Sequence, residues 1–242
     1  MKITKMLAIA SLCLAVAGCS NTKKESNKAA EYYAQLGAGY LQKNRLPLAK
    51  EYLEKALAKD RRSASAQHYY AMLQDRLGNH KLANDYFRKA VRQDSKNPEL
   101  LNNYGSHLCR QGQYKLAIQA FTAALKDPLY QTPEFAWANA GICLQRSGHS
   151  QQAASYLRKA LQINAKFPLA LYHMAELEHL QGQNARAQAF LYRYNELARD
   201  TPETLLLCSD IHKALGELTQ AEKCANTLIA RFPKSEQARK LN

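Results

Sequence analysis

The fold is decided by residues 98–125, which read PELLNNYGSHLCRQGQYKLAIQAFTAAL. The stretch predicts two short helices joined by a tight turn at Gly112. In the second helix, Ala117, Phe121 and Ala124 recur at i, i+4 and i+7, so they lie on one face. A hairpin of this size cannot bury both of its apolar faces alone, and it therefore requires neighbouring copies.

The copies appear as two ladders of equivalent residues in one register. The alanine ladder is Ala49, Ala83, Ala117, Ala153, Ala187 and Ala221, with steps of 34, 34, 36, 34 and 34 residues. The turn ladder is Asn44, Gly78, Gly112, Gly148, Gly182 and Gly216. Since glycine and asparagine both tolerate a left-handed backbone, the turn ladder predicts that conformation at every step. A helix–turn–helix period of 34 residues resembles the tetratricopeptide repeat, TPR.

This resemblance implies an all-α fold, a right-handed superhelical solenoid of six TPR repeats. The expected repeats are 30–63, 64–97, 98–131, 134–167, 168–201 and 202–235. Residues 236–242 form a C-terminal segment that is expected to cap the last repeat with a polar surface.

Composition places bounds on the function. The chain has 242 residues and a formal net charge of +14. Its basic residues are spread over every repeat and interleaved with acidic ones, and no RNP, zinc-finger or basic-region pattern is present. The charge therefore indicates a solvated, mildly basic surface, and no nucleic-acid partner is expected.

The N-terminus has the pattern of a lipoprotein signal. Lys2 and Lys5 precede an apolar run that is too short to span a bilayer. It ends in Val-Ala-Gly-Cys at residues 16–19, which resembles the lipobox of bacterial lipoproteins. We expect residues 1–18 to be a signal peptide, Cys19 to be lipidated, and 19–29 to be a flexible tether. The alternative is an ordinary secretory signal with an incidental cysteine. Ser20 after the cysteine favours the outer membrane, with the protein facing the periplasm.

No pattern in the chain specifies catalysis. The seven histidines are scattered without an HExxH motif, and G-x-S-x-G, P-loop and G-x-G-x-x-G motifs are missing from the sequence. Glu176 and His179 form one E-x-x-H pair, but a di-iron bundle uses two such pairs. We therefore expect a binding protein that is not an enzyme and that uses neither a metal nor a cofactor.

Four cysteines remain after Cys13 and Cys19. Cys109 and Cys143 fall on the first helices of adjacent repeats, which lie side by side in a solenoid, so the spacing favours a disulfide between them. Cys208 and Cys224 lie on the two helices of repeat 6 and are a second candidate pair. Four free buried thiols are the alternative to both.

TPR solenoids bind partners in a groove built mainly from the first helix, helix A, of each repeat. Reading the groove positions of repeats 2 to 5 predicts a partner surface. Its candidate residues are His68, Met72, Arg76, Asn102, Ser106, Arg110, Ala138, Ile142, Arg146 and Tyr172. The three arginines share one register and form either a basic stripe for an acidic segment or cations that favour the C-termini of their own helices.

Repeats 3 and 4 carry a more specific resemblance. The sequence of residues 102–121 and 127–148 resembles the PilF/PilW family of type IV pilus biogenesis lipoproteins. The matching residues are Asn103, Tyr104, Gly105, Cys109, Gln111, Gly112, Tyr114, Pro128, Tyr130, Pro133, Asn139, Gly141 and Cys143.

The resemblance implies a pilotin, a lipid-anchored protein that binds the type IV pilus secretin and supports its localisation, multimerisation or stability. The secretin is the expected protein partner, and the protein itself is expected to be monomeric. Two alternatives stay open at this point. One is a general periplasmic TPR scaffold for cell-wall enzymes or outer-membrane assembly, and the other is a carrier of small ligands.

Overall fold

The structure, a computed structural model, describes residues 25–241. The predicted signal peptide, Cys19 and the first part of the tether lie outside the described residues. The described chain consists of helices and short connections, with no strand between residues 25 and 241. The predicted all-α TPR fold is confirmed. No helix in this part of the chain combines the length and the apolar character that crossing a bilayer requires.

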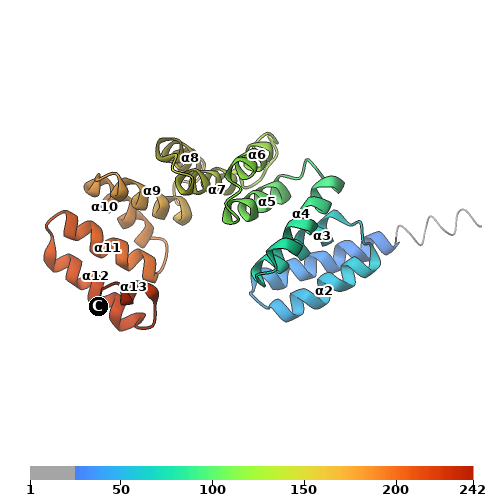
Figure 1. Cartoon of the computed structure of the whole chain (residues 1–242), viewed down its shortest axis with the longest axis horizontal. Coiled ribbons are helices and arrows are strands. Elements are labelled where there is room, and N and C mark those ends of the chain that lie inside the picture. The colour runs from blue at the N-terminus through green and yellow to red at the C-terminus, as the bar shows by residue number, and fades with distance from the viewer. Residues whose placement is uncertain (1–24, 242) are drawn as a thin grey trace, which may run out of the picture. The chain divides into compact units, whose positions relative to one another are not determined.

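The described chain divides into two compact units, and the division falls at His107, within α5. Figure 1 shows the helices in chain order. The first unit contains a helix over residues 25–42, α2 (Leu46–Lys59), α3 (Ala64–Arg76), α4 (His80–Gln93) and most of α5 (Pro98–Arg110). The second contains α6 (Tyr114–Ala124), α7 (Pro133–Arg146), α8 (Ser150–Ile163), α9 (Pro168–Leu180), α10 (Asn184–Asn195), α11 (Pro202–Ala214), α12 (Leu218–Arg231) and α13 (Glu236–Arg239).

The turn ladder has the backbone conformation that the sequence predicts. The φ angle is positive at Asn44 (54°), Gly78 (79°), Gly112 (73°), Gly148 (84°), Gly182 (74°) and Gly216 (77°). Each of these residues ends a helix A and redirects the chain into the second helix of the pair, helix B. The helix pairs α3–α4, α7–α8, α9–α10 and α11–α12 pack together, as Figure 1 shows.

Small residues of the alanine ladder lie in the core of each unit. In the first unit, Ala49 packs with Leu53 and Leu73. In the second unit, Ala153 packs with Leu157. All five side chains are fully buried. The ladder therefore marks the places where helix B approaches helix A most closely, since a larger side chain would hold the two helices apart.

Gly37 sits at a similar close approach in the first unit. A Cβ atom built on Gly37 would lie 2.5 Å from Leu53 Cγ, and Leu53 is itself buried in the core. Gly39 lies two residues further along the same helix, and a Cβ atom there would meet nothing within 4 Å. Close packing against Leu53 therefore requires a glycine at position 37, whereas no such contact requires one at position 39.

We predict opposite effects of alanine at these two positions. Gly37→Ala is expected to lower the free energy of unfolding by about 2 kcal/mol because it overpacks the contact with Leu53. Gly39→Ala is expected to raise it by up to about 1 kcal/mol because alanine favours a helix over glycine. Urea denaturation of both variants measures the difference, and equal effects at the two positions would contradict the close approach.

The tether is shorter than the sequence analysis assigned. Residues 25–29 were placed in the tether, but they form the beginning of the helix over residues 25–42. Ser26 Oγ donates to the Lys59 carbonyl oxygen at 2.7 Å, which ties this helical turn to the end of α2. Polar composition alone did not reveal this tertiary contact.

The C-terminal segment covers the end of the second unit. Ser235 begins α13 as its N-cap, and its side chain accepts from the Ala238 amide at 3.1 Å. Ala238 is buried against Leu205 of α11 and Leu228 of α12. The short helix thus seals the core edge of the last repeat, as capping segments of solenoids do.

One carboxylate is buried in the second unit. Glu178 of α9 is 1% exposed, and its Oε1 atom lies 2.9 Å from Arg186 of α10 and 3.7 Å from Arg158 of α8. It occupies the position, four residues before the turn glycine, at which α5 and α7 carry Leu108 and Leu144. The two ion pairs therefore offset the cost of burying the Glu178 carboxylate at a helix position where α5 and α7 carry leucine.

Removing the arginine should be more harmful than removing the acid. We predict that Arg186→Ala lowers the free energy of unfolding by about 2 kcal/mol because it leaves the buried carboxylate with one distant cation, a cost reduced by the partial exposure of the arginine. Glu178→Leu should be nearly neutral, and adding it to Arg186→Ala should recover most of the loss. A double-mutant cycle measured by urea denaturation tests this, and a full cost in the double variant would refute it.

Candidate partner-binding site

The structure places His68 in the interior of the first unit. Its side chain is stacked on Tyr69 with ring centroids 4.6 Å apart, and only 3% of the residue is exposed. The Asn103 amide nitrogen lies 3.0 Å from His68 Nε2. Burial lowers the pKa of His68 to about 4, so the ring is neutral at pH 7. His68 therefore exposes almost no surface to a partner, although it forms part of the wall of a polar pocket in the first unit.

Two other predicted groove residues are also buried. Asn102 of α5 is in the interior of the first unit, and Ala138 of α7 belongs to the core of the second. Both side chains contribute to packing and cannot form an accessible partner surface. His68, Asn102 and Ala138 hold the same helix-A position in repeats 2, 3 and 4, and this position is buried in all three. At the same position of repeat 5, Tyr172 is half-buried.

The remaining candidates of the first unit are partly or fully exposed. Arg76 donates through Nη1 to the Leu41 carbonyl oxygen at 2.5 Å, so it satisfies a terminal carbonyl of the helix over residues 25–42, the helix A of the preceding repeat. Met72 is half-buried, and its sulfur lies 3.5 Å from the Asn103 amide nitrogen. Ser106 is half-buried and donates to the Asn102 carbonyl oxygen at 3.0 Å. Arg76 therefore has a structural role that sequence position alone did not indicate.

The candidates of the second unit lie on α5, α7 and α9. Arg110 and Arg146 are exposed, whereas Ile142 and Tyr172 are half-buried. Arg76 belongs to the first unit and the other two arginines to the second, so a continuous basic stripe stays a prediction.

Tyr172 opens into a pocket of about 450 Å³ between α9, α11 and the C-terminal segment. The apolar part of the wall includes Leu206 and Leu180, of which Leu180 is 69% exposed. The charged part is acidic. Three carboxylates, Glu176, Glu203 and Asp210, line the pocket together with His179 and the single ammonium group of Lys240. A large exposed leucine beside carboxylates suits an extended segment that carries both apolar and basic side chains.

Hydrogen bonds keep the Glu176 carboxylate ionised. His173 Nδ1 lies 3.1 Å from Glu176 Oε2, and this hydrogen bond is the main reason why the pKa of Glu176 is below its ordinary value. Gln145 donates to the same oxygen at 3.0 Å. Burial raises the pKa of Tyr172, so its phenol stays protonated and can donate.

The helix-A groove positions of repeat 5 include four residues that line this pocket, namely Tyr172, Glu176, His179 and Leu180, whereas its repeat 6 side was not predicted. The groove positions were read in repeats 2 to 5 and not in repeat 6. At the same helix-A positions 2, 5 and 9, repeat 6 carries Glu203, Leu206 and Asp210, and all three line the pocket. Extending the register by one repeat would have predicted them.

The first unit has a polar pocket of its own, with a volume of about 410 Å³. It lies where the helix over 25–42, the α2–α3 connection and the start of α5 come together. Its carboxylates are Glu31, Asp60, Asp94 and Glu99, and none of its lining residues is a lysine or an arginine. Acidic side chains thus predominate among the charged groups of both of these pockets, although the chain as a whole has a net charge of +14.

Both candidate cysteine pairs form disulfides in the structure. Cys109 at the end of α5 is bonded to Cys143 of α7, with Cα atoms 5.7 Å apart, and both residues are buried. Cys208 of α11 is bonded to Cys224 of α12, with Cα atoms 6.0 Å apart, and both residues are half-buried.

Comparison with known proteins supports the repeat assignment. Two family models described as tetratricopeptide repeat match the chain, one at residues 34–98, 76–133 and 103–166 and the other at 144–204. No curated protein matches the sequence. A tetratricopeptide repeat protein from Parabacteroides merdae shares the fold, with a TM-score of 0.68 at 18% identity over 88% of this chain and 82% of its own.

Two solved structures are similar over nearly their whole length. PilF of Pseudomonas aeruginosa is 29% identical, with a TM-score of 0.78 over 90% of this chain and 98% of its own. PilW, described as a widely conserved type IV pilus biogenesis factor, is 30% identical, with a TM-score of 0.81 over 89% of this chain and 99% of its own. The chain belongs to the PilF/PilW family of tetratricopeptide-repeat proteins. TPR proteins are protein-interaction scaffolds and typically not enzymes.

In this PilF/PilW-family protein, the two residues of the E-x-x-H pattern, Glu176 and His179, have different hydrogen-bond partners. Glu176 is bonded to His173, while His179 Nδ1 lies 2.7 Å from Asn184 Oδ1. Among residues 25–241, two other clusters have the residue types and the proximity that a metal ion requires, namely Asp75 with His80 and His107, and Cys208 with His212 and Cys224.

The first of these clusters is held together by hydrogen bonds. Asp75 Oδ1 lies 2.8 Å from His107 Nδ1 and 3.0 Å from His80 Nδ1, which connects α3, α4 and α5. Asp75 thus orients the His107 imidazole, and its buried Nε2 has no hydrogen-bond partner within the part of the chain that the structure describes. We interpret this cluster of the PilF/PilW-family fold as a structural junction between repeats.

Proposed function

We propose that this PilF/PilW-family protein is a pilotin. In this proposal it is an outer-membrane lipoprotein that faces the periplasm, binds the type IV pilus secretin and supports its localisation, multimerisation or stability. The observation that carries the proposal is the similarity to PilW, which extends over 89% of this chain and 99% of PilW at 30% identity.

The N-terminal sequence supports the membrane address. Val-Ala-Gly-Cys at residues 16–19 matches a lipobox, and acyl chains on Cys19 would hold the protein at the membrane surface while the TPR units extend from it. In this proposal the lipid supplies the location and the helix-A surfaces supply the partner contact.

The chemistry of the acidic pocket next to Tyr172 supports a particular class of secretin segment. Carboxylates at Glu203 and Asp210 attract basic side chains, and Leu180 and Leu206 offer apolar contact. A secretin segment in which lysine or arginine alternates with apolar residues fits this surface. An acidic segment, which the arginine register suggested, would be repelled here.

A complementation experiment tests the pocket and the function together. The gene is deleted, plasmid-borne variants restore it, and detergent-resistant secretin multimers are measured by immunoblot. Asp210→Lys and Leu180→Asp are expected to reduce the multimers because each changes the pocket without entering the core. Matched controls are Glu222→Lys and Leu218→Asp on α12, since Leu218 is 63% exposed, as Leu180 is 69% exposed.

The outcomes separate the proposal from its alternative. If multimers persist in the deletion strain, the pilotin function is wrong. If they are lost in the deletion strain but restored equally by pocket and control variants, the function stands and the pocket is not its contact surface. A pull-down from solubilised envelope that yields cell-wall enzymes and no secretin would favour the general TPR scaffold.

The anchor is tested by Cys19→Ala. This variant is expected to leave the outer-membrane fraction and appear in the soluble periplasmic fraction, because it lacks the acylation site. Fractionation followed by immunoblot measures the shift. A variant that still fractionates with the outer membrane would show that the lipid is not the anchor.

A further inference from the structure

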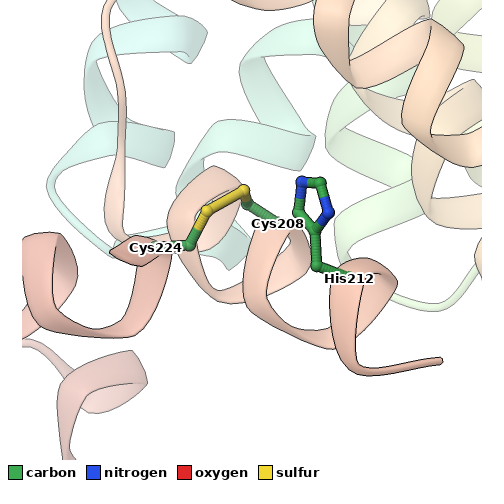
Figure 2. Close-up of side chains that lie close together, drawn as sticks. All are labelled: Cys208, His212 and Cys224. Carbon is green, nitrogen blue, oxygen red and sulfur yellow. A yellow bond between two sulfur atoms is a disulfide. The ribbon is translucent and has the colours of Figure 1, made fainter. Parts of the chain in front are cut away.

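Three side chains of repeat 6 converge at the surface of the second unit. Cys208 and His212 are four residues apart on α11 and so lie on one face, and Cys224 of α12 faces them. One potential ligand atom of each residue lies within 4.8 Å of the other two. Figure 2 shows the imidazole of His212 beside the Cys208–Cys224 disulfide.

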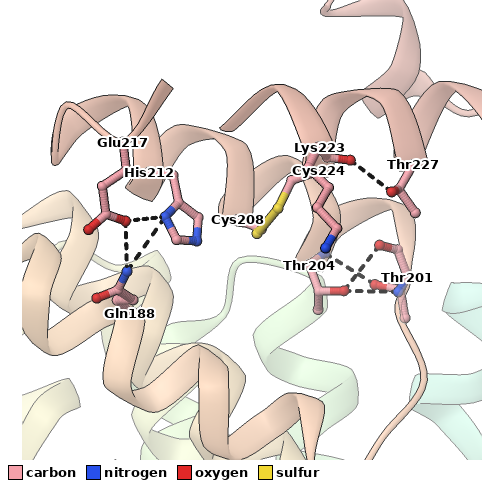
Figure 3. Close-up of a disulfide and its surroundings, with 9 residues drawn as sticks. All are labelled: Gln188, Thr201, Thr204, Cys208, His212, Glu217, Lys223, Cys224 and Thr227. Carbon is pink, nitrogen blue, oxygen red and sulfur yellow. Dashed lines mark hydrogen bonds and ion pairs between the residues drawn. A yellow bond between two sulfur atoms is a disulfide. The ribbon is translucent and has the colours of Figure 1, made fainter. Parts of the chain in front are cut away.

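The imidazole is held in a defined orientation by a carboxylate. His212 Nδ1 lies 2.5 Å from Glu217 Oε2, and Gln188 donates to the same oxygen at 3.0 Å (Figure 3). A carboxylate oxygen accepts this hydrogen bond, so Nδ1 is the donor and Nε2 is the ring nitrogen left for a metal. A carboxylate that orients a histidine in this way is the usual second shell of a zinc-bound imidazole.

Accessibility distinguishes this cysteine pair from the other one. Cys208 and Cys224 are half-buried, whereas Cys109 and Cys143 are buried. A reductant in solution can therefore reach the repeat 6 disulfide in the folded protein, while packing protects the other. Two thiols and an oriented imidazole would then lie together at the surface.

We infer that Cys208, Cys224 and His212 bind a zinc ion when their disulfide is reduced, with water as the fourth ligand. Tetrahedral zinc, with bonds of about 2.3 Å to sulfur and about 2.0 Å to nitrogen, requires ligand atoms about 3.5 to 3.8 Å apart. The observed grouping within 4.8 Å reaches this geometry by small side-chain rotations. The sequence itself predicts no metal site, because it has no HExxH motif and only one E-x-x-H pair.

The change between the two states is balanced. A dithiol reductant passes two electrons and two protons to the disulfide, the sulfur–sulfur bond breaks, and the reductant closes its own disulfide. Zinc then replaces the two thiol protons, which pass to solvent, and both sulfurs bind as thiolates. In either state α11 and α12 are cross-linked at the same place, so repeat 6 remains stapled after reduction.

The test uses the full folded chain. The protein is treated with a water-soluble phosphine, and alkylation with mass spectrometry verifies that Cys208 and Cys224 are reduced. Zinc binding is measured by competition with a chromophoric chelator, and cobalt(II) is used as a spectroscopic probe. We expect one equivalent to bind, with an affinity at least about 100-fold higher than that of the oxidised protein, and a cobalt–thiolate charge-transfer band.

Two variants and one control assign the ligands. His212→Gln is expected to weaken zinc binding by about 100-fold and to change the cobalt spectrum, and Glu217→Gln is expected to weaken it by about 10-fold. The control is Glu222→Gln, which changes an exposed carboxylate on α12. It should bind zinc as tightly as the unchanged protein does. Circular dichroism confirms that each variant is folded.

Three results would overturn the inference. They are a disulfide that cannot be reduced while the protein is folded, a reduced protein that binds zinc no more tightly than the oxidised one, and zinc binding that His212→Gln leaves unchanged. None of these depends on the secretin, so the zinc site and the proposed pilotin function fail or stand separately.

Discussion

Replacing Cys109 and Cys143 together with alanine is expected to lower the free energy of unfolding by about 4 kcal/mol. The disulfide closes a loop of 34 residues, and the entropy that such a closure removes from the unfolded chain corresponds to about this value. The native state should keep its helices, because both side chains are small and lie in the packed interior. Urea denaturation followed by circular dichroism measures the loss.

The repeat 6 disulfide offers a matched comparison. It closes a loop of 16 residues, so Cys208→Ala with Cys224→Ala is expected to cost about 3 kcal/mol, less than the first pair. A reductant should open the more exposed disulfide first. We expect it to reduce Cys208–Cys224 in the folded protein and Cys109–Cys143 only after unfolding. A double variant of Cys109 and Cys143 as stable as the unchanged protein would contradict the assigned role of the buried cross-link.

Lowering the pH from 7 to 4 is expected to destabilise the first unit by about 3 kcal/mol through His68 alone. Burial lowers the pKa of His68 to about 4, against an ordinary value of about 6.5 in an unfolded chain. The unfolded state therefore takes up a proton before the folded state does. The contribution of His68 is complete above pH 6.5 and is lost progressively as the pH falls toward 4.

The variant His68→Gln isolates this effect. Glutamine does not titrate, and its side-chain oxygen can accept from Asn103 as the His68 ring nitrogen does. The difference in unfolding free energy between the two proteins should therefore shrink or reverse in favour of the variant as the pH falls. Denaturation curves at several pH values measure it, and parallel pH profiles would refute the buried neutral imidazole.

Local periodicity was sufficient to predict the repeats, because the requirements of a TPR are largely local. Gly112 needs a left-handed backbone wherever the hairpin is placed, and Ala117 needs to be small wherever helix B meets helix A. The same register brought Cys109 and Cys143 to the correct helices. Tyr172 was also assigned to an accessible surface, which the structure places at the edge of an acidic pocket.

Prediction failed where burial depends on a neighbouring helix. His68 and Asn102 occupy groove positions in the repeat pattern, but their side chains are enclosed within the first unit. Arg76 reaches a carbonyl oxygen in helix A of the preceding repeat, a partner 35 residues away in sequence. Such contacts depend on side-chain lengths and on where neighbouring helices lie, and the residue pattern of one repeat does not specify either.

Spacing and residue size along one chain specify a helical hairpin, so the TPR fold, its turns and the family likeness could be predicted from the amino acids alone. Residues 98–125, which predict the fold, lie at the division between the two units. Three features depend on how the helices pack: which helix-A residues face solvent, the pocket that the repeat 6 carboxylates line together with Tyr172, and the placement of His212, bonded to Glu217, beside two cysteines. The physical reason is that solvation, charge and ligand geometry depend on distances between helices, which local spacing does not specify.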